Sequence, residues 1–279
     1  MPTREREQWT RSGVRLRPVV SGAGRWNWLL VPGGPGLGSE SLVGLAQAVR
    51  VPGTVWLVDL PGDGSNRDLR PGSPDPYGDW PGVLVEAAQA LDDAVMVGHS
   101  TGGMFMLSVP ELEEHLAGMA VISSAPHAGW RDAFARYTEE HPIPEVAVAA
   151  EQYAREPGDE TLRALTMAAA PWNFGQAALS SGRSLLAGLP YNNDAVTWAD
   201  ANFDETYKAR WAPRTVPMLI VSGEQDRVVD QQLWQQPGSD FTRPNILHRR
   251  IEGAGHFPWV ENPESVRGAF GELAALLER

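Results

Sequence analysis

Six short segments of apolar residues are spaced along the chain, and each has the length of a β-strand. Three of them contain continuous apolar runs, at positions 55–58, 95–97 and 219–221, without the polar alternation of a strand that faces solvent on one side. Strands buried on both faces have this pattern, and parallel sheets covered by helices bury both faces. The six predicted strands span residues 26–31, 54–59, 94–98, 119–123, 218–222 and 246–251.

Segments with helical periodicity lie between the predicted strands. Strands that alternate with helices indicate βαβ units, so we expect an α/β fold with a mostly parallel central sheet flanked by helices. The predicted helices span residues 39–49, 80–91, 102–116 and 263–278.

The alternation stops between residues 127 and 212, where helical patterns continue without a convincing strand. The patterns cover residues 129–140, 145–155, 161–169 and 193–210. We therefore predict a core domain formed by residues 1–126 and 213–279, with residues 127–212 inserted as a helical cap, or lid.

Tryptophan is frequent in this chain, with 11 residues in all. Indole rings are large and rigid, so they suit the wall of an apolar pocket, although ordinary core packing uses them equally well. We predict that Trp130 and Trp172, together with Phe257, contact a substrate. The tryptophans in or beside the predicted cap are Trp130, Trp172, Trp198 and Trp211.

Composition narrows the classes of function. Cysteine is absent, which excludes disulfides and a cysteine nucleophile. The formal net charge is −12 and no run is rich in Lys or Arg, which disfavours nucleic acid and anionic membranes as partners. No pair of histidines has metal-ligand spacing, so we expect neither a metal nor a cofactor. The charged N-terminus lacks the apolar segment of a signal peptide, so we expect a cytoplasmic protein. We also expect a monomer or homodimer that acts on a small molecule.

A Gly-x-Ser-x-Gly motif lies between the third predicted strand and the helix that follows it. The serine is Ser100, flanked by Gly98 and Gly102. In this context the motif is typical of a nucleophile elbow, a sharp turn that raises the hydroxyl above the sheet. The glycines are needed because the positions beside the serine are crowded. We predict Ser100 as a nucleophile, and His99 beside it as a packing residue.

A glycine-rich turn follows the first predicted strand, with the sequence Pro-Gly-Gly-Pro-Gly at positions 32–36. Glycines let backbone amides approach a substrate oxygen closely. Pro35 has no N–H to donate, so we predict that the amide of Gly34 forms an oxyanion hole with the amide of Thr101. The N-terminus of the helix after Ser100 adds a favourable partial charge there.

A carboxylate and a histidine follow the last two predicted strands. Asp226 lies three residues after Gly223, and His256 follows the sixth strand. Because the carboxyl ends of parallel strands meet at one edge of a sheet, both side chains can converge on Ser100. We predict His256 as the base and Asp226 as the group that orients it. Glu224 and Asp230 remain alternatives for the carboxylate.

These motifs, in the order Ser, Asp, His, resemble the α/β-hydrolase superfamily, closest to its proline iminopeptidase and ester hydrolase branch. The resemblance implies the α/β-hydrolase fold and a cap over the active site. It rests on residues 33–36 (Gly-Gly-Pro-Gly), 59–65 (Asp-Leu-Pro-Gly-Asp-Gly-Ser) and 98–103 (Gly-His-Ser-Thr-Gly-Gly), Gly223-x-x-Asp226 and Gly255-His256.

The predicted function is hydrolysis of a small carboxylic ester or amide through an acyl-enzyme intermediate. Alternatives on the same triad are a proline iminopeptidase-type aminopeptidase, a C–C bond hydrolase and an acyltransferase. A non-enzymatic ligand sensor is a further alternative, from a different class of protein. The iminopeptidase pattern has histidine where this chain has Pro32 and tryptophan where it has Thr101. Candidates for acidic cap residues that bind a free amino terminus are Glu139, Glu140, Glu145 and Glu151.

Overall fold

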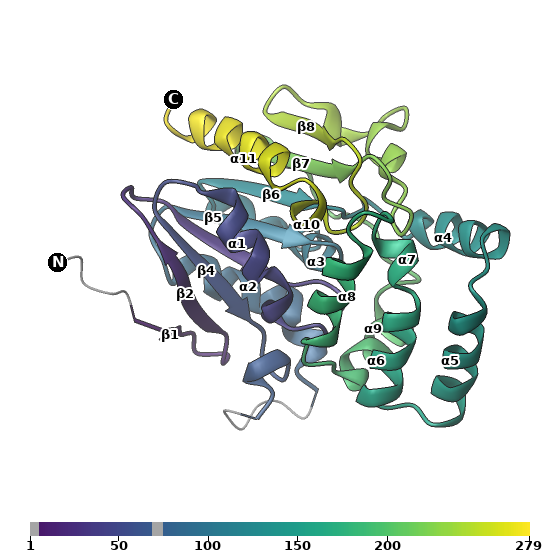
Figure 1. Cartoon of the computed structure of the whole chain (residues 1–279). Coiled ribbons are helices and arrows are strands. Elements are labelled where there is room, and N and C mark those ends of the chain that lie inside the picture. Colours follow the sequence, from purple (N-terminus) through teal and green to yellow (C-terminus); the bar gives the residue numbers. More distant parts are fainter. Residues whose placement is uncertain (1–5, 69–74) are drawn as a thin grey trace.

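The computed structural model describes residues 6–68 and 75–279, so the first five residues of the charged N-terminus lie outside it. Within these ranges one sheet of eight strands has the order β1-β2-β4-β3-β5-β6-β7-β8 (Figure 1). Strand β2 is antiparallel to β1 and β4, and all other neighbours are parallel. The strands are β1 (Gln8–Trp9), β2 (Arg15–Ser21), β3 (Asn27–Val31), β4 (Thr54–Asp59), β5 (Ala94–His99), β6 (Gly118–Ile122), β7 (Met218–Gly223) and β8 (Ile246–Ile251).

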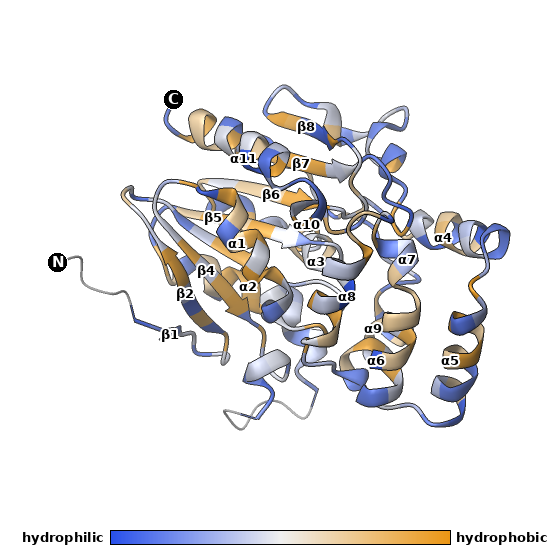
Figure 2. Cartoon of the chain, viewed as in Figure 1, coloured by the Kyte–Doolittle hydropathy of each residue, from blue (hydrophilic) through white to orange (hydrophobic). Residues whose placement is uncertain are grey.

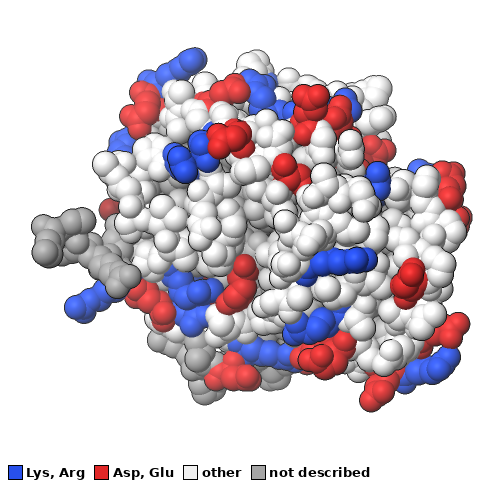
Figure 3. Space-filling view, viewed as in Figure 1, with Lys and Arg blue, Asp and Glu red and all other residues white. Residues whose placement is uncertain are grey.

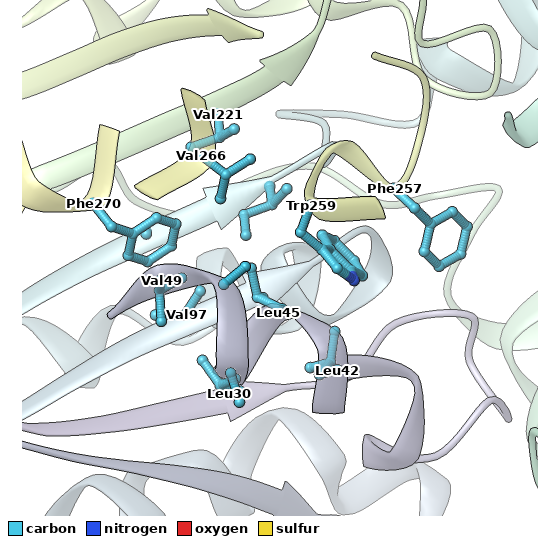
Figure 4. Close-up of a cluster of buried hydrophobic side chains, with 14 of the residues drawn as sticks. Leu30, Leu42, Leu45, Val49, Val97, Val221, Phe257, Trp259, Val266 and Phe270 are labelled. Atoms are coloured by element: carbon cyan, nitrogen blue, oxygen red, sulfur yellow. The ribbon is translucent and has the colours of Figure 1, made fainter. Parts of the chain in front are cut away.

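Helices cover both faces of the sheet. Successive residues of the parallel strands point to opposite faces, so Leu30 and Val97 pack on one side, whereas Leu29 and Met96 pack on the other. Helices α1 (Val43–Val49) and α11 (Pro263–Leu277) cover the first face, as the close-up in Figure 4 shows. Helices α2 (Trp80–Gln89) and α3 (Thr101–Leu107) cover the second. The predicted α/β class is therefore confirmed.

All six predicted strands are present, but β1 and β2 were not predicted. Strand β2 is only partly buried, carries Arg15 and Arg17, and has a register shift after Pro18. Both arginines form ion pairs with the buried carboxylate of Asp59 at the end of β4. A strand with this mixture of charged residues and a proline has no continuous apolar run. Its contribution to the sheet could not be predicted for that reason.

Two predicted helices are shorter than expected. The helix predicted at 102–116 ends at Leu107, and Pro110 begins a separate 3₁₀ helix, Pro110–Glu114. Proline lacks the N–H that would continue the helix. The helix predicted at 193–210 ends at Asn202. The segment predicted as the first helix, residues 39–49, is divided into the 3₁₀ helix Ser39–Leu42 and α1.

Between β6 and β7 the chain forms helices without contributing a strand to the sheet. They lie beyond the carboxyl ends of β6 and β7 (Figure 1). The limits of the cap, 127–212, stay a prediction. In the described ranges, no helix combines the length and apolar character needed to span a membrane. The helices between these strands are α4 (Gly129–Glu140), α5 (Pro144–Arg155), α6 (Asp159–Ala168), α7 (Ala170–Asn173), α8 (Leu179–Ala187) and α9 (Asn193–Asn202).

Candidate active site

Ser100 lies at the junction of β5 and α3, with φ 49° and ψ −123°. This positive φ is uncommon for a residue with a side chain. A Cβ at Gly98 would lie 2.5 Å from the amide nitrogen of Gly103, and one at Gly102 would lie 2.4 Å from the carbonyl oxygen of Pro32. The two glycines of the motif are therefore required by close backbone packing. The strained turn presents the serine hydroxyl at the edge of the sheet.

The three predicted triad residues come together at this edge. Nε2 of His256 lies 3.2 Å from Oγ of Ser100. Nδ1 of the same ring lies 3.1 Å from each carboxylate oxygen of Asp226. The side chain of His256 is 6% exposed and that of Asp226 is fully buried. With the proton on Nδ1 shared with the carboxylate, Nε2 is free to accept the proton of the serine hydroxyl.

Asp226 is held by its own loop. One carboxylate oxygen accepts hydrogen bonds from the amides of Val228 and Val229, both at 3.0 Å, and the other accepts one from the side-chain amide of Gln231 at 3.2 Å. These contacts fix the carboxylate opposite the imidazole. Gln231 was not predicted, and its position five residues after the aspartate gave no distinct signal.

The two alternative carboxylates have other partners. Glu224 accepts a hydrogen bond from the amide of Gly253 and forms an ion pair with Arg250 at 3.1 Å. Asp230 accepts a hydrogen bond from the amide of Gln232 at the start of a 3₁₀ helix. Asp226 is the carboxylate that the fold places beside the imidazole of His256.

The predicted oxyanion residues also lie beside Ser100. Gly34 has φ 121° and packs next to the elbow, where its carbonyl accepts a long hydrogen bond of 3.5 Å from the hydroxyl of Thr101. A Cβ on Gly33 would lie 2.4 Å from the carbonyl oxygen of His99, which shows how closely the two turns pack. Within the described ranges, the amides of Gly34 and Thr101 donate no hydrogen bond to another residue. They are therefore available as donors.

His99 is buried behind the elbow. Its Nε2 lies 3.0 Å from the carbonyl oxygen of His256, so Nε2 carries the proton and donates it to that carbonyl. Its ring contacts Phe257 and Trp259, with centroid distances of 4.8 Å for both. Burial, followed by the nearby His256 ring, lowers the pKa of His99 well below its usual value. A neutral His99 thus packs beneath the triad, as its position beside the serine predicted.

A cavity of about 220 Å³ opens onto Ser100. Its walls come from the core and from the cap helices, which contribute Trp130, Leu162, Leu186 and Val196. Trp130 and Phe257, two of the three predicted substrate contacts, line it. Trp172 does not: its indole N–H donates to the carbonyl of His141, and its ring packs edge-on against Phe134.

The cavity is lined mainly by apolar side chains. Besides Ser100, His256, His99 and the oxyanion residues, its polar lining residues are Thr166 and Asn173. Of the described residues that line it, none is an Asp, Glu, Lys or Arg. The four acidic cap residues considered for binding an amino terminus are exposed and lie outside the cavity lining; they are Glu139, Glu140, Glu145 and Glu151.

His127, Trp198 and Trp211 do not line the cavity and make contacts elsewhere. His127 accepts a hydrogen bond from the amide of Gly129 through Nδ1. Trp211 donates to the carbonyl of Met106, and Trp198 packs against Phe203.

Across residues 6–68 and 75–279, no group of three His, Asp or Glu side chains is arranged to hold a metal ion. On the face shown in Figure 3, acidic and basic side chains are interspersed.

Comparison with known proteins identifies the family of the chain. The model of a family described as the alpha/beta hydrolase family matches residues 19–269. This match spans most of the sequence, and the chain belongs to the alpha/beta hydrolase family. The predicted family and the predicted hydrolase fold are thereby confirmed.

Individual relatives have low sequence identity to this chain. A pimeloyl-(acyl-carrier protein) methyl ester esterase of Xanthomonas oryzae pv. oryzae is 28% identical over 229 residues, covering 78% of this chain and 83% of the relative. An esterase of the same name from Xylella fastidiosa is 25% identical over 235 residues, covering 84% and 89%.

Solved structures share the fold at low sequence identity. A proline iminopeptidase-related protein from Thermus thermophilus has a TM-score of 0.71 and 18% identity, with 99% of each chain covered. A thermophilic esterase from Thermogutta terrifontis has a TM-score of 0.67 and 18% identity, covering 99% of this chain and 100% of the other. At this identity the likeness concerns the fold alone.

Proposed function

We propose that this protein is a carboxylic ester hydrolase that uses Ser100, His256 and Asp226 as a catalytic triad. The observation that carries the proposal is the continuous row of contacts from hydroxyl to imidazole to buried carboxylate, with distances of 3.2 Å and 3.1 Å. A row of this kind activates a serine that is otherwise a weak nucleophile.

In the proposed reaction, Oγ of Ser100 attacks the ester carbonyl carbon while Nε2 of His256 takes the hydroxyl proton. Asp226 stabilises the imidazolium, and the amides of Gly34 and Thr101 donate to the developing oxyanion. Collapse of the intermediate breaks the ester C–O bond, and the alcohol leaves with the proton from His256. Water then attacks the acyl-enzyme, His256 takes a proton from the water, and the carboxylic acid departs as Ser100 is reprotonated.

The cavity limits the size and charge of the proposed substrate. Its volume of about 220 Å³ lies below the roughly 300–1,000 Å³ of pockets for drug-sized ligands. A charged group of the substrate would be desolvated there without an oppositely charged partner, which is costly. We therefore infer that the part of the substrate bound next to Ser100 is short and uncharged.

The names of the relatives support ester cleavage over peptide cleavage. Two distant relatives are named as methyl ester esterases. An aminopeptidase must bind a free ammonium group near the nucleophile, and no carboxylate side chain among the described residues lines this cavity. The iminopeptidase alternative therefore lacks the group that its substrate needs.

The test compares wild type with Ser100→Ala on short acyl esters and on arylamides of amino acids, proline included. We expect wild type to cleave uncharged short-chain esters in preference to the arylamides, and Ser100→Ala to lose about 10⁴-fold or more in kcat. Equal turnover by the two proteins would remove Ser100 from the mechanism. Binding of the esters without turnover by either protein would favour a ligand sensor.

A further inference from the structure

The segment 173–175 of the cap, at the end of α7, is fastened to the loop that carries His256. The carbonyl oxygen of Asn173 accepts the amide N–H of His256 at 2.9 Å. A Cβ on Gly255 would lie only 2.5 Å from the same oxygen, so the two backbones are in direct contact. The backbone of the base is therefore anchored by a residue outside the sheet.

Glu261 joins the same two segments through its side chain. It is the last residue of α10 (Pro258–Glu261), five positions after His256. One carboxylate oxygen accepts the amide N–H of Gly175 at 2.7 Å, and the other accepts the amide N–H of Gly255. Hydrogen bonds with one charged partner are about twice as strong as neutral ones. A single carboxylate thus bridges the cap and the loop of the base.

Further contacts surround this bridge. The ring of Phe174, in the middle of the cap segment, stacks on Phe257 with a centroid distance of 5.0 Å and an interplanar angle of 22°. Behind the loop, His99 donates to the carbonyl oxygen of His256. The base is consequently held at its N–H by Asn173, at its carbonyl by His99 and through Gly255 by Glu261.

We propose that Glu261 is a positioning residue, whose carboxylate ties cap segment 173–175 to the His256 loop and so keeps the imidazole within reach of Ser100. This inference rests on the proposed function of Ser100 and His256. The physical reason is geometric, because a displacement of about 1 Å in a reacting group can reduce the rate about 100-fold. Glu261 acts through the backbone of the loop and takes no part in proton transfer.

The test is Glu261→Gln, which keeps the shape of the side chain but offers one acceptor oxygen in place of two. We expect kcat to fall about 10-fold to 100-fold while KM changes by less than about 2-fold, since the side chain of Glu261 does not itself line the cavity. The matched control is Glu264→Gln on the next helix. Glu264 is 76% exposed and pairs with Arg267 within its own helix, so the kcat of this variant should equal that of wild type.

Two results would overturn the inference: a folded Glu261→Gln protein with wild-type kcat, or a parallel loss in both glutamate variants. Failure of Ser100→Ala to lose activity would instead remove the proposed function, so the two failures are distinguishable.

If Glu261→Gln does not fold, amide hydrogen exchange in the wild-type protein tests the inference instead. The inference predicts that the amides of Gly175 and Gly255 exchange more slowly than that of Gly253, whose acceptor Glu224 is 35% exposed. Exchange of either amide at the rate of an unprotected one would contradict it.

Discussion

The sheet and the cap bury their residues in different ways. The residues of β4, β5 and β6 are all buried, whereas α4 contains no buried residue and α5 contains only Ala149. Figure 2 shows the same contrast, with hydrophobic strands in the interior and alternating colours along α4 and α5. The sheet is a dense frame that carries the elbow, while α4 and α5 of the cap leave nearly all their residues partly or fully exposed.

Two buried carboxylates, Asp59 in the core and Asp204 in the cap, differ in their partners. Asp59, at the end of β4, pairs with Arg15 and Arg17, both at 2.6 Å. Asp204, just after α9, is 7% exposed, and its Oδ1 has no hydrogen-bond partner in the described structure. Two arginines thus neutralise Asp59, whereas no ion pair of 4 Å or less joins Asp204 to another described residue. Burial, together with the nearby Asp200, raises the pKa of Asp204 to about 6.

The largest expected effect lies at the edge of the sheet. Asp226→Asn should reduce kcat about 10⁴-fold with little change in stability, because the amide cannot hold the required tautomer of His256. Steady-state kinetics on a short acyl ester measure the loss. Asp230→Asn, in the same loop, is the control and should retain activity. A loss in both variants of similar size would mean that the loop, not the carboxylate, is responsible.

The packing contrast predicts unequal costs of truncation. Leu30→Ala removes a fully buried side chain from β3 and should lower the free energy of unfolding by about 2–5 kcal/mol. Val148→Ala, on α5, removes a side chain that is 70% exposed and should change it by less than about 0.5 kcal/mol. Urea denaturation of both variants measures the difference. A loss of unfolding free energy in Val148→Ala as large as that in Leu30→Ala would contradict the exposure of Val148 on α5.

The unpaired carboxylate predicts a pH effect of defined sign. Asp204 binds its proton more tightly in the folded state, with a pKa of about 6 against the ordinary 3.8. Its contribution to stability is therefore complete below about pH 4 and is lost as the pH rises through about 6. Each pKa unit corresponds to about 1.4 kcal/mol, so Asp204→Asn should stabilise the protein at neutral pH by up to roughly 3 kcal/mol.

Unfolding curves of wild type and Asp204→Asn between pH 4 and pH 7 test this prediction. Burial also raises the pKa of Asp63 to about 6 and gives a slope of the same sign. Asp63 is present in both proteins, so the difference between them isolates Asp204. A difference that does not grow with pH would contradict the account of Asp204.

The smallest effect is expected on the outer surface of the cap. Glu151 pairs with Arg155 one helical turn away, and both side chains are more than two-thirds exposed. Exposed pairs of this kind contribute little. Glu151→Gln should therefore match wild type in thermal unfolding and in kinetics on esters and arylamides. A selective loss of arylamide cleavage would restore the aminopeptidase alternative.

The contrast between the two regions also explains which features could be predicted. Strands β4 and β8 have the predicted limits because their residues differ sharply from the flanking turns. The convergence of Asp226 and His256 followed from the rule that parallel strands end at one edge. Contacts such as Glu261 with Gly175 join segments 86 residues apart and leave no local pattern. Trp172 lies outside the cavity lining, and this could not be predicted because helical periodicity does not say which cap face meets the cavity.

Covalent labelling tests the central claim most directly. Wild-type protein is incubated with a fluorophosphonate at neutral pH, digested, and mapped by mass spectrometry. We expect one adduct, on the peptide that contains Ser100, and much slower labelling in Asp226→Asn. An unlabelled Ser100, or an adduct on another residue while Ser100 stays free, would contradict it.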